Sequence, residues 1–199
     1  MRVSNDAGPS WSEGSQGNML QETIASHYFN NVFWQNDPDC VVLRDERTHL
    51  LAHEVEALGL WSGILGGTVT TSDVLHRLPP GRLALWRFLE PGEKGGATLP
   101  FWEEERRLKV AVRRYAEGEA WAALFLNPAA GAVTDRVDVA SLVGQREAFA
   151  WEWGPERAQP LGKRSDLVVE TVGHASRLYY LSLSDAPPPA GLTLGGKRT

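Results

Sequence analysis

The spacing of apolar residues changes about halfway along the chain. Before residue 93, apolar positions recur every three or four residues, a spacing that predicts amphipathic helices. These helices are expected over residues 19–31, over residues 44–58 (or from Thr48), and from Pro80 to the stop at Glu90-Pro91-Gly92. Two β-prone runs lie between them, VFWQ at residues 32–35 and GILGGTVTTSD at residues 63–73. Alternating helices and strands are typical of an α/β fold with parallel strands.

After residue 97 the apolar runs become short and alternating, and they are rich in β-branched and aromatic residues. The runs cover residues 107–115, 120–127, 133–142, 147–153, 166–172 and 176–184. Because Gly and Pro separate runs of this length, the pattern predicts an antiparallel β-sandwich. The chain is therefore expected to divide into an α/β part over residues 1–93, a β-sandwich domain over residues 98–186 and a flexible tail over residues 187–199.

The composition argues against nucleic-acid binding, a membrane span and a disulfide. The formal net charge is -5 and no dense Lys/Arg cluster occurs, so we expect no nucleic-acid partner. The longest apolar run, near residues 58–69, contains Ser and Gly and is too short to span a bilayer. Cys40 is the only cysteine, which excludes a disulfide within the chain and suits a reducing cytoplasm. We expect no metal and no cofactor.

Aspartates gather in two unusual stretches, MRVSNDAGPSW at the start and FWQNDPDCVVLRDE from residue 33. Asp37 and Asp39 follow the predicted strand at residues 32–35, where catalytic side chains gather in parallel α/β folds. Residues two apart on a strand share a face, although Pro38 weakens that geometry. Aspartate is also a common turn residue, so a purely structural role for each of them stays open.

These two stretches resemble motifs of the glycoside hydrolase family 36 α-galactosidases, the melibiases. The first resembles the acid/base segment, in which Met-Arg precedes an Asp and a Pro-x-Trp element. The second resembles the strand and loop that follow, with Trp-x-Asn-Asp-Pro-Asp-Cys and then an arginine. The resemblance implies the C-terminal part of a (β/α)8 barrel, followed by the family's antiparallel β-sandwich domain.

The resemblance also implies a retaining hydrolysis of terminal α-galactosides by two carboxylates. By motif position, Asp6 is the acid/base and Arg2 binds a galactose hydroxyl. Trp11 forms a wall of the site, while Asp37 and Asp39 organise the loop behind it. The residues between Arg2 and Asp6, and Gly8, differ from those usual in the family.

The nucleophile that the resemblance implies belongs to a Lys-x-Asp segment, and no such segment occurs in these 199 residues. A whole barrel needs about 200–250 residues. The chain alone is therefore expected to be inactive, and to aggregate, form a homo-oligomer or associate with a chain that supplies the missing half. The alternative is a non-catalytic carbohydrate-binding β-sandwich module, in which Trp151 and Trp153 could stack on a sugar or pack between sheets.

Overall fold

The computed structural model describes residues 1–12, 14–88, 97–114, 119–154 and 158–186. The helices are α1 (Gln16–Ala25), η1 (His27–Phe29), α2 (Ala52–Leu65), η2 (Leu75–Arg77), α3 (Pro80–Phe88) and α4 (Val139–Val143). The strands are β1 (Lys109–Arg114), β2 (Ala120–Leu126), β3 (Val133–Asp138), β4 (Ala148–Glu152), β5 (Gln159–Arg164), β6 (Asp166–Thr171) and β7 (Ser176–Ser182). The predicted tail over residues 187–199 and the predicted boundary near residue 93 lie outside the described residues.

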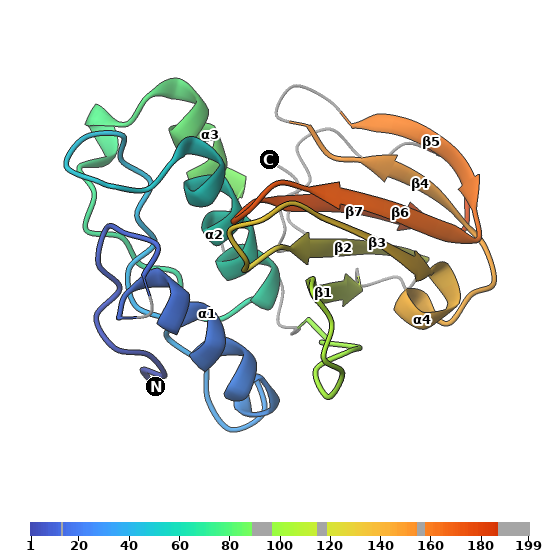
Figure 1. Ribbon diagram of the computed structural model, residues 1–199, viewed down its shortest axis with the longest axis horizontal. Helices are drawn as coiled ribbons and strands as arrows, with labels where there is room; N and C mark the ends of the chain where they lie inside the picture. Colours follow the sequence, from blue (N-terminus) through green and yellow to red (C-terminus); the bar gives the residue numbers. More distant parts are fainter. Residues whose placement is uncertain (13, 89–96, 115–118, 155–157, 187–199) are drawn as a thin grey trace.

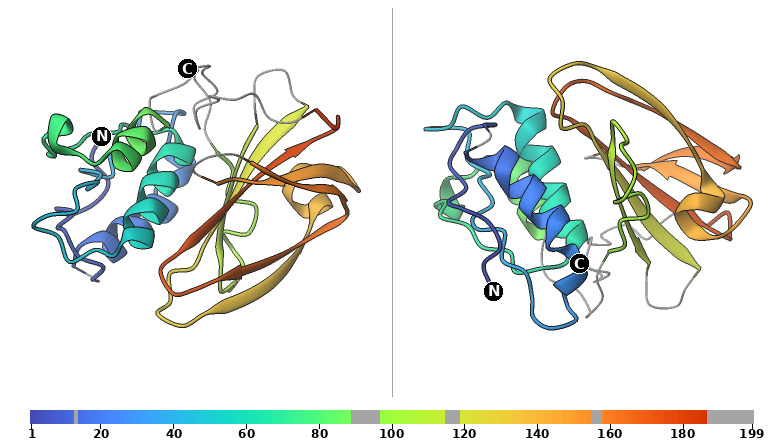
Figure 2. Two further views of the ribbon diagram at one scale, coloured as in Figure 1. Left: turned by 90° about the horizontal axis from the view of Figure 1, so that it is seen from above. Right: turned by 60° about the horizontal axis from the view of Figure 1, so that its bottom comes forward.

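The second half of the chain forms two packed antiparallel sheets (Figure 1). The larger has the order β1-β2-β7-β4-β5, and the smaller pairs β3 with β6. The smaller sheet and α4 cover one face of the larger sheet, while α2 lies against the other face with α1 and α3 beside it (Figure 2). The predicted antiparallel sandwich is confirmed.

The two faces of the larger sheet belong to two apolar cores. On β2, Leu124 packs with Trp61 and Ile64 of α2, whereas its neighbour Phe125 packs with Val137 and other residues between the sheets. Successive side chains of a strand point to opposite faces, so the run AWAALFL is buried on both sides. The N-terminal part and the sandwich therefore share the first of these cores, which lies between α2 and the larger sheet.

Helix α2 lies later in the chain than the sequence predicted, because it begins at Ala52 rather than at Arg44 or Thr48 and ends at Leu65 rather than at Leu58. Gly59, predicted to end the helix or to sit in its last turn, lies in the middle of α2, and the helix stops at Gly66, whose φ of 69° is left-handed. A Cβ at Gly59 would lie 3.1 Å from Leu85 Cδ2, so glycine lets α3 approach closely there. The strand predicted over residues 63–73 is consequently wrong at its start, because residues 63–65 form the last turn of α2.

The strand predicted at residues 32–35 is also wrong. Val32 and Phe33 lie in a turn, Trp34 makes only an isolated bridge to Asn30, and Phe33 is 72% exposed. Asn31 has a φ of 61°, a conformation that asparagine tolerates better than most residues and that suits a turn.

Extended segments from three parts of the chain do lie side by side in parallel. Arg2 pairs with Asp37, and Cys40 pairs with Thr70. These contacts are isolated bridges because Asp39 has a left-handed backbone and its N–H donates to Asp37 Oδ1 rather than to a neighbouring segment. The parallel direction agrees with the α/β prediction, but the described residues contain no regular parallel strand, so the barrel part remains a prediction.

Two elements of the sandwich were missed. β5 has the sequence QPLGKR, whose mostly exposed residues give no apolar alternation, and its Pro160 is tolerated on an edge strand. The run at residues 133–142 was predicted as one strand, yet β3 ends at Asp138 and α4 follows at once.

Candidate active site

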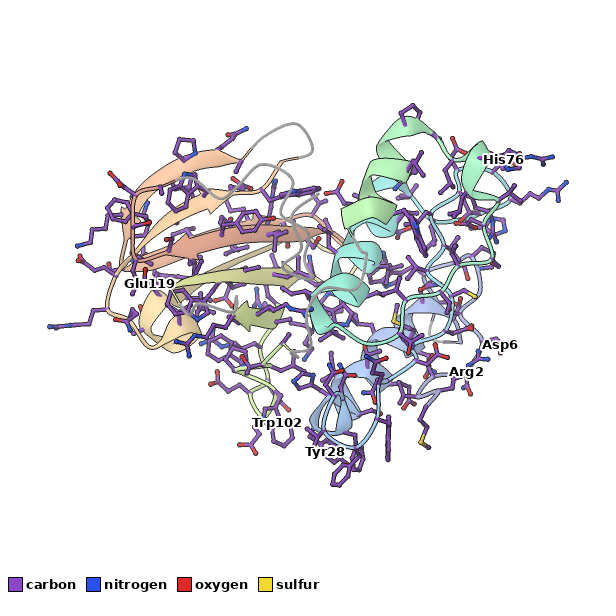
Figure 3. The ribbon with its side chains drawn as sticks, turned by 180° about the vertical axis from the view of Figure 1, so that it is seen from behind. Arg2, Asp6, Tyr28, His76, Trp102 and Glu119 are labelled. Carbon is purple, nitrogen blue, oxygen red and sulfur yellow. The ribbon has the colours of Figure 1, made fainter. Side chains whose placement is uncertain are left out.

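One guanidinium nitrogen joins two of the predicted aspartates. Arg2 Nη2 lies 2.7 Å from Asp6 Oδ1 and 2.8 Å from Asp39 Oδ2. The Asp6 side chain is 97% exposed, whereas that of Asp39 is 19% exposed. Figure 3 shows Arg2 and Asp6 next to each other at the edge of the molecule farthest from the sheets. A solvent-facing carboxylate is thus linked through Arg2 to a more buried one.

The backbone of Asp39 explains its position. Its φ of 75° lies in the left-handed region, which Asp adopts more readily than most residues. Asp37 Oδ1 accepts the Asp39 N–H at 3.0 Å, which closes the turn around Pro38. Asp39 Oδ2 also accepts the Ala7 N–H at 2.7 Å, so this carboxylate holds the backbone directly after Asp6.

Backbone hydrogen bonds dock the first residues onto this turn. The Val3 N–H donates to Asp37 O at 2.9 Å, and the Asp37 N–H donates to Met1 O at 2.8 Å. Ser4 Oγ donates to Pro38 O at 2.7 Å. The start of the chain and the Asn-Asp-Pro-Asp turn therefore form one unit, which brings Arg2, Asp6, Asp37 and Asp39 together.

The loop after Asp6 is anchored on two further elements. Gly8 O accepts hydrogen bonds from Ser15 Oγ at 2.7 Å and from Gln16 Nε2 at 3.0 Å. Gln16 is buried at the start of α1, so it offers a fixed donor. The His49 N–H donates to Pro9 O at 2.8 Å. These contacts fix the carbonyls of Gly8 and Pro9 in the loop after Asp6.

Trp11 contacts a different part of the molecule. Its ring stacks on the ring of His174, with 4.4 Å between centroids and 10° between planes. His174 lies between β6 and β7 and belongs to no sequence motif that would mark it as a functional residue. The role of Trp11 as a wall of a sugar site stays a prediction.

A second buried carboxylate was also missed. The Asp73 side chain is fully buried, pairs with Arg44 Nη1 at 2.7 Å, and accepts the backbone N–H groups of Leu43 and Arg44. It holds the extended segment after Cys40 against the segment after Thr70. In the sequence Asp73 ends a Thr-Thr-Ser-Asp run, which looks like any turn.

The described residues contain no group of three or more His, Cys, Asp or Glu side chains placed to hold a metal ion. Within the same part of the chain, every helix is too short or too polar to cross a bilayer.

The fold resembles solved glycoside hydrolases, although no known family's sequence model matches the chain. A family 27 β-L-arabinopyranosidase from Geobacillus stearothermophilus is 16% identical, with a TM-score of 0.77 over 94% of this chain and 46% of that one. α-Galactosidase I from Mortierella vinacea is 12% identical, with a TM-score of 0.72 over 90% of this chain and 52% of that one. An α-galactosidase from Saccharomyces cerevisiae is 12% identical, with a TM-score of 0.70 over 92% of this chain and 59% of that one.

The chain thus has the fold of part of an α-galactosidase-type glycoside hydrolase, and it spans about half the length of these structures. Its antiparallel sheets agree with the C-terminal β-sandwich that the motifs implied. The family named among these structures is family 27, so membership of family 36 stays a prediction.

Proposed function

We propose that this chain is the acid/base-bearing part of a retaining glycoside hydrolase that acts on terminal α-galactosides. Asp6 is the proton donor, and Arg2 orients both the carboxylate and a sugar hydroxyl. The observation that carries the proposal is the bridge from Asp6 through Arg2 to Asp39, on a fold similar to that of α-galactosidases.

The geometry suits a group that must reach a substrate. An acid/base must first protonate the leaving oxygen and then take a proton from water. The Asp6 side chain is almost fully exposed and is held by one ion pair, so both its substrate and water can approach it. Arg2 has a planar fork of N–H donors: Nη2 contacts the two carboxylates and Nε donates to Ser4 O at 3.1 Å, so Nη1 is the nitrogen that can donate to a hydroxyl.

The nucleophile must come from outside these 199 residues. Retention needs a second carboxylate about 5–5.5 Å from the acid/base, which attacks the anomeric carbon while Asp6 protonates the departing oxygen. Water activated by Asp6 then releases the sugar. Since the chain spans about half of the similar enzymes, we propose that the 199 residues alone do not hydrolyse galactosides.

An exposed aromatic surface supports this view of an incomplete enzyme. Tyr28 and Phe33 are 65% and 72% exposed, and both contact the Phe29 ring, at 3.9 Å and 5.8 Å between centroids. Apolar surface of this kind on a soluble protein marks a contact site. We assign it to the remainder of the barrel, with association between copies as the outcome when that part is missing.

The alternative of a separate carbohydrate-binding module has weaker support. Trp151 is buried, so it offers no platform for a sugar ring. Trp153 is only partly buried, but it packs against the core shared with α2. The proposed reaction needs no metal or cofactor, and the cytoplasmic location expected from the lone Cys40 is retained as part of the proposal.

The test uses the protein extended by the residues encoded upstream in its gene. The extended protein should hydrolyse a nitrophenyl α-galactoside, and Asp6→Ala should lower turnover about 10²- to 10⁴-fold, as expected for loss of an acid/base. Azide needs no general base, so it should restore turnover in Asp6→Ala and yield a galactosyl azide of retained configuration. The matched control is Asp45→Ala, which removes an exposed aspartate that lies outside the candidate site.

Two results would contradict the proposal. One is hydrolysis by the 199-residue chain alone that disappears in Asp6→Asn, which would mean that the nucleophile lies within it. The other is full activity of the extended Asp6→Ala variant, which would remove the acid/base role of Asp6.

A further inference from the structure

A side chain of the β-domain contacts the loop after Asp6. His174, in the turn between β6 and β7, stacks on Trp11 with 4.4 Å between ring centroids and 10° between planes. Trp11 lies five positions after Asp6 in the same loop. In Figure 1 this turn reaches the helical part of the molecule beside α2.

A buried carboxylate fixes the direction of the imidazole. Glu54 Oε1 lies 2.7 Å from His174 Nδ1, and Glu54 Oε2 accepts the Leu51 N–H at 2.7 Å. Glu54 is buried in the first turn of α2, so it is held by its own helix. Because a carboxylate accepts hydrogen bonds, Nδ1 carries the proton and the ring plane is set.

The backbone of the turn is also held in an uncommon conformation. His174 has a φ of 59°, in the left-handed region, although it is not a glycine. The fully buried Asn127 donates through Nδ2 to Val172 O at 3.0 Å, and its N–H donates to Ala175 O at 2.9 Å. The His174 N–H donates to Ala129 O at 3.1 Å. Such residues persist where their surroundings over-determine them, and they gather at functional sites.

The loop is therefore held at both ends by non-glycine residues with left-handed backbones. At one end Asp39 holds Arg2 and the Ala7 N–H, and at the other end His174 holds Trp11. We propose that His174 is a positioning residue, by which the β-domain fixes the loop that presents Asp6. The importance of the loop's position for catalysis rests on the proposed function. The coupling, by which His174 acts through Trp11 on the loop at Ala7, does not depend on that function.

The coupling can be measured on the 199-residue chain without any sugar. Two NMR signals are followed in ¹⁵N-labelled protein: the indole N–H of Trp11, assigned by its loss in Trp11→Phe, and hydrogen exchange of the Ala7 amide. In His174→Ala the indole signal should shift, because a stacked ring is removed. Exchange at Ala7 should become roughly 2- to 12-fold faster, the range to which aromatic stacking energies convert.

A conservative variant and a matched control separate positioning from general stability. His174→Phe keeps a ring on Trp11 but loses the hydrogen bond to Glu54, so exchange at Ala7 should lie between that of His174→Ala and that of wild type. His76→Ala removes an exposed histidine on η2 (Figure 3) and should change neither signal. If His174→Ala does not fold, Trp11→Leu removes the same stack from the other side. Hydrogen exchange at the Ala7 amide is then measured in that variant and should again become faster.

Two outcomes overturn the proposal. In the first, the indole signal shifts in His174→Ala while exchange at Ala7 is unchanged, so the effect of His174 does not extend beyond Trp11 to the loop. In the second, the amide of Val169 in the core of the β-domain accelerates as much as that of Ala7, so the change is a general loss of stability. Because neither readout involves hydrolysis, the coupling and the glycosidase proposal can fail separately.

Discussion

Asp39 Oδ2 lies 2.8 Å from Arg2 Nη2 and accepts the Ala7 N–H at 2.7 Å, so one carboxylate oxygen holds residues on both sides of Asp6. The Asp39 side chain is mostly buried, which strengthens both interactions relative to a surface pair. This relationship separates two roles that the sequence motif alone does not separate. Asp39 determines the shape of the loop, and Asp6 faces the solvent from it.

Replacing Asp39 should therefore destabilise the protein. Asp39→Ala loses both interactions and places alanine at a φ of 75°, so it should lower the free energy of unfolding by about 2–4 kcal/mol. Asp39→Asn tolerates the left-handed backbone and can still accept the Ala7 N–H, so it should cost only about 1 kcal/mol. Urea denaturation of the two variants measures the difference, and equal losses would contradict this account of the loop.

Asp6 should show the opposite behaviour. Its side chain is 97% exposed, so Asp6→Asn should change the free energy of unfolding by less than about 0.5 kcal/mol. In the extended enzyme the same substitution should abolish most of the activity. A stability loss in Asp6→Asn as large as that in Asp39→Ala would show that Asp6 is a structural residue.

Asp73 provides a third test, at the buried pair with Arg44. Its carboxylate accepts two backbone N–H groups and one guanidinium, and none of its side chain is exposed. Asp73→Ala leaves these donors without their acceptor, so it should cost about 3–5 kcal/mol. Asp45→Ala, an exposed substitution close in sequence, should stay within about 0.5 kcal/mol of wild type in the same denaturation experiment. Similar values for the two variants would mean that Asp73 does not hold the two segments together.

Most strands of the sandwich could be predicted because each of them carries its own local signal. Runs such as those of β2 and β7 contain enough apolar and aromatic residues to specify burial locally. β5 could not be predicted, because an edge strand with polar side chains depends on its partner β4 for its structure. The end of α2 was misjudged for a similar reason. Glycine lowers the local preference for a helix, but Gly59 packs against Leu85 of α3, and this contact between distant residues is not visible in the local sequence.

The residues of the candidate site likewise include some that the sequence could predict and one that it could not. Arg2, Asp6 and Asp39 belong to short motifs, and the structure brings these residues together. Their roles in catalysis remain predictions. His174 could not be predicted, because Glu54, its hydrogen-bond partner, is 120 residues away and no local pattern connects the two. Contacts of this kind arise only when the turn between β6 and β7 meets α2, and that meeting is a property of the whole fold.

The partly buried imidazole of His27 should make the free energy of unfolding depend on pH. Burial lowers the pKa of its imidazole below 6.5, although a hydrogen bond to the Ala97 backbone acts in the opposite direction. The unfolded chain therefore binds more protons than the folded one between the folded pKa and 6.5, and stability is lost as the pH falls through this window. His27→Gln cannot take up that proton, so its free energy of unfolding should fall less steeply than that of wild type between pH 7.5 and pH 5.5. His76→Gln, at an exposed site, should keep the wild-type slope. Denaturant titrations across this range provide the measurement, and identical slopes for wild type and His27→Gln would contradict the assignment.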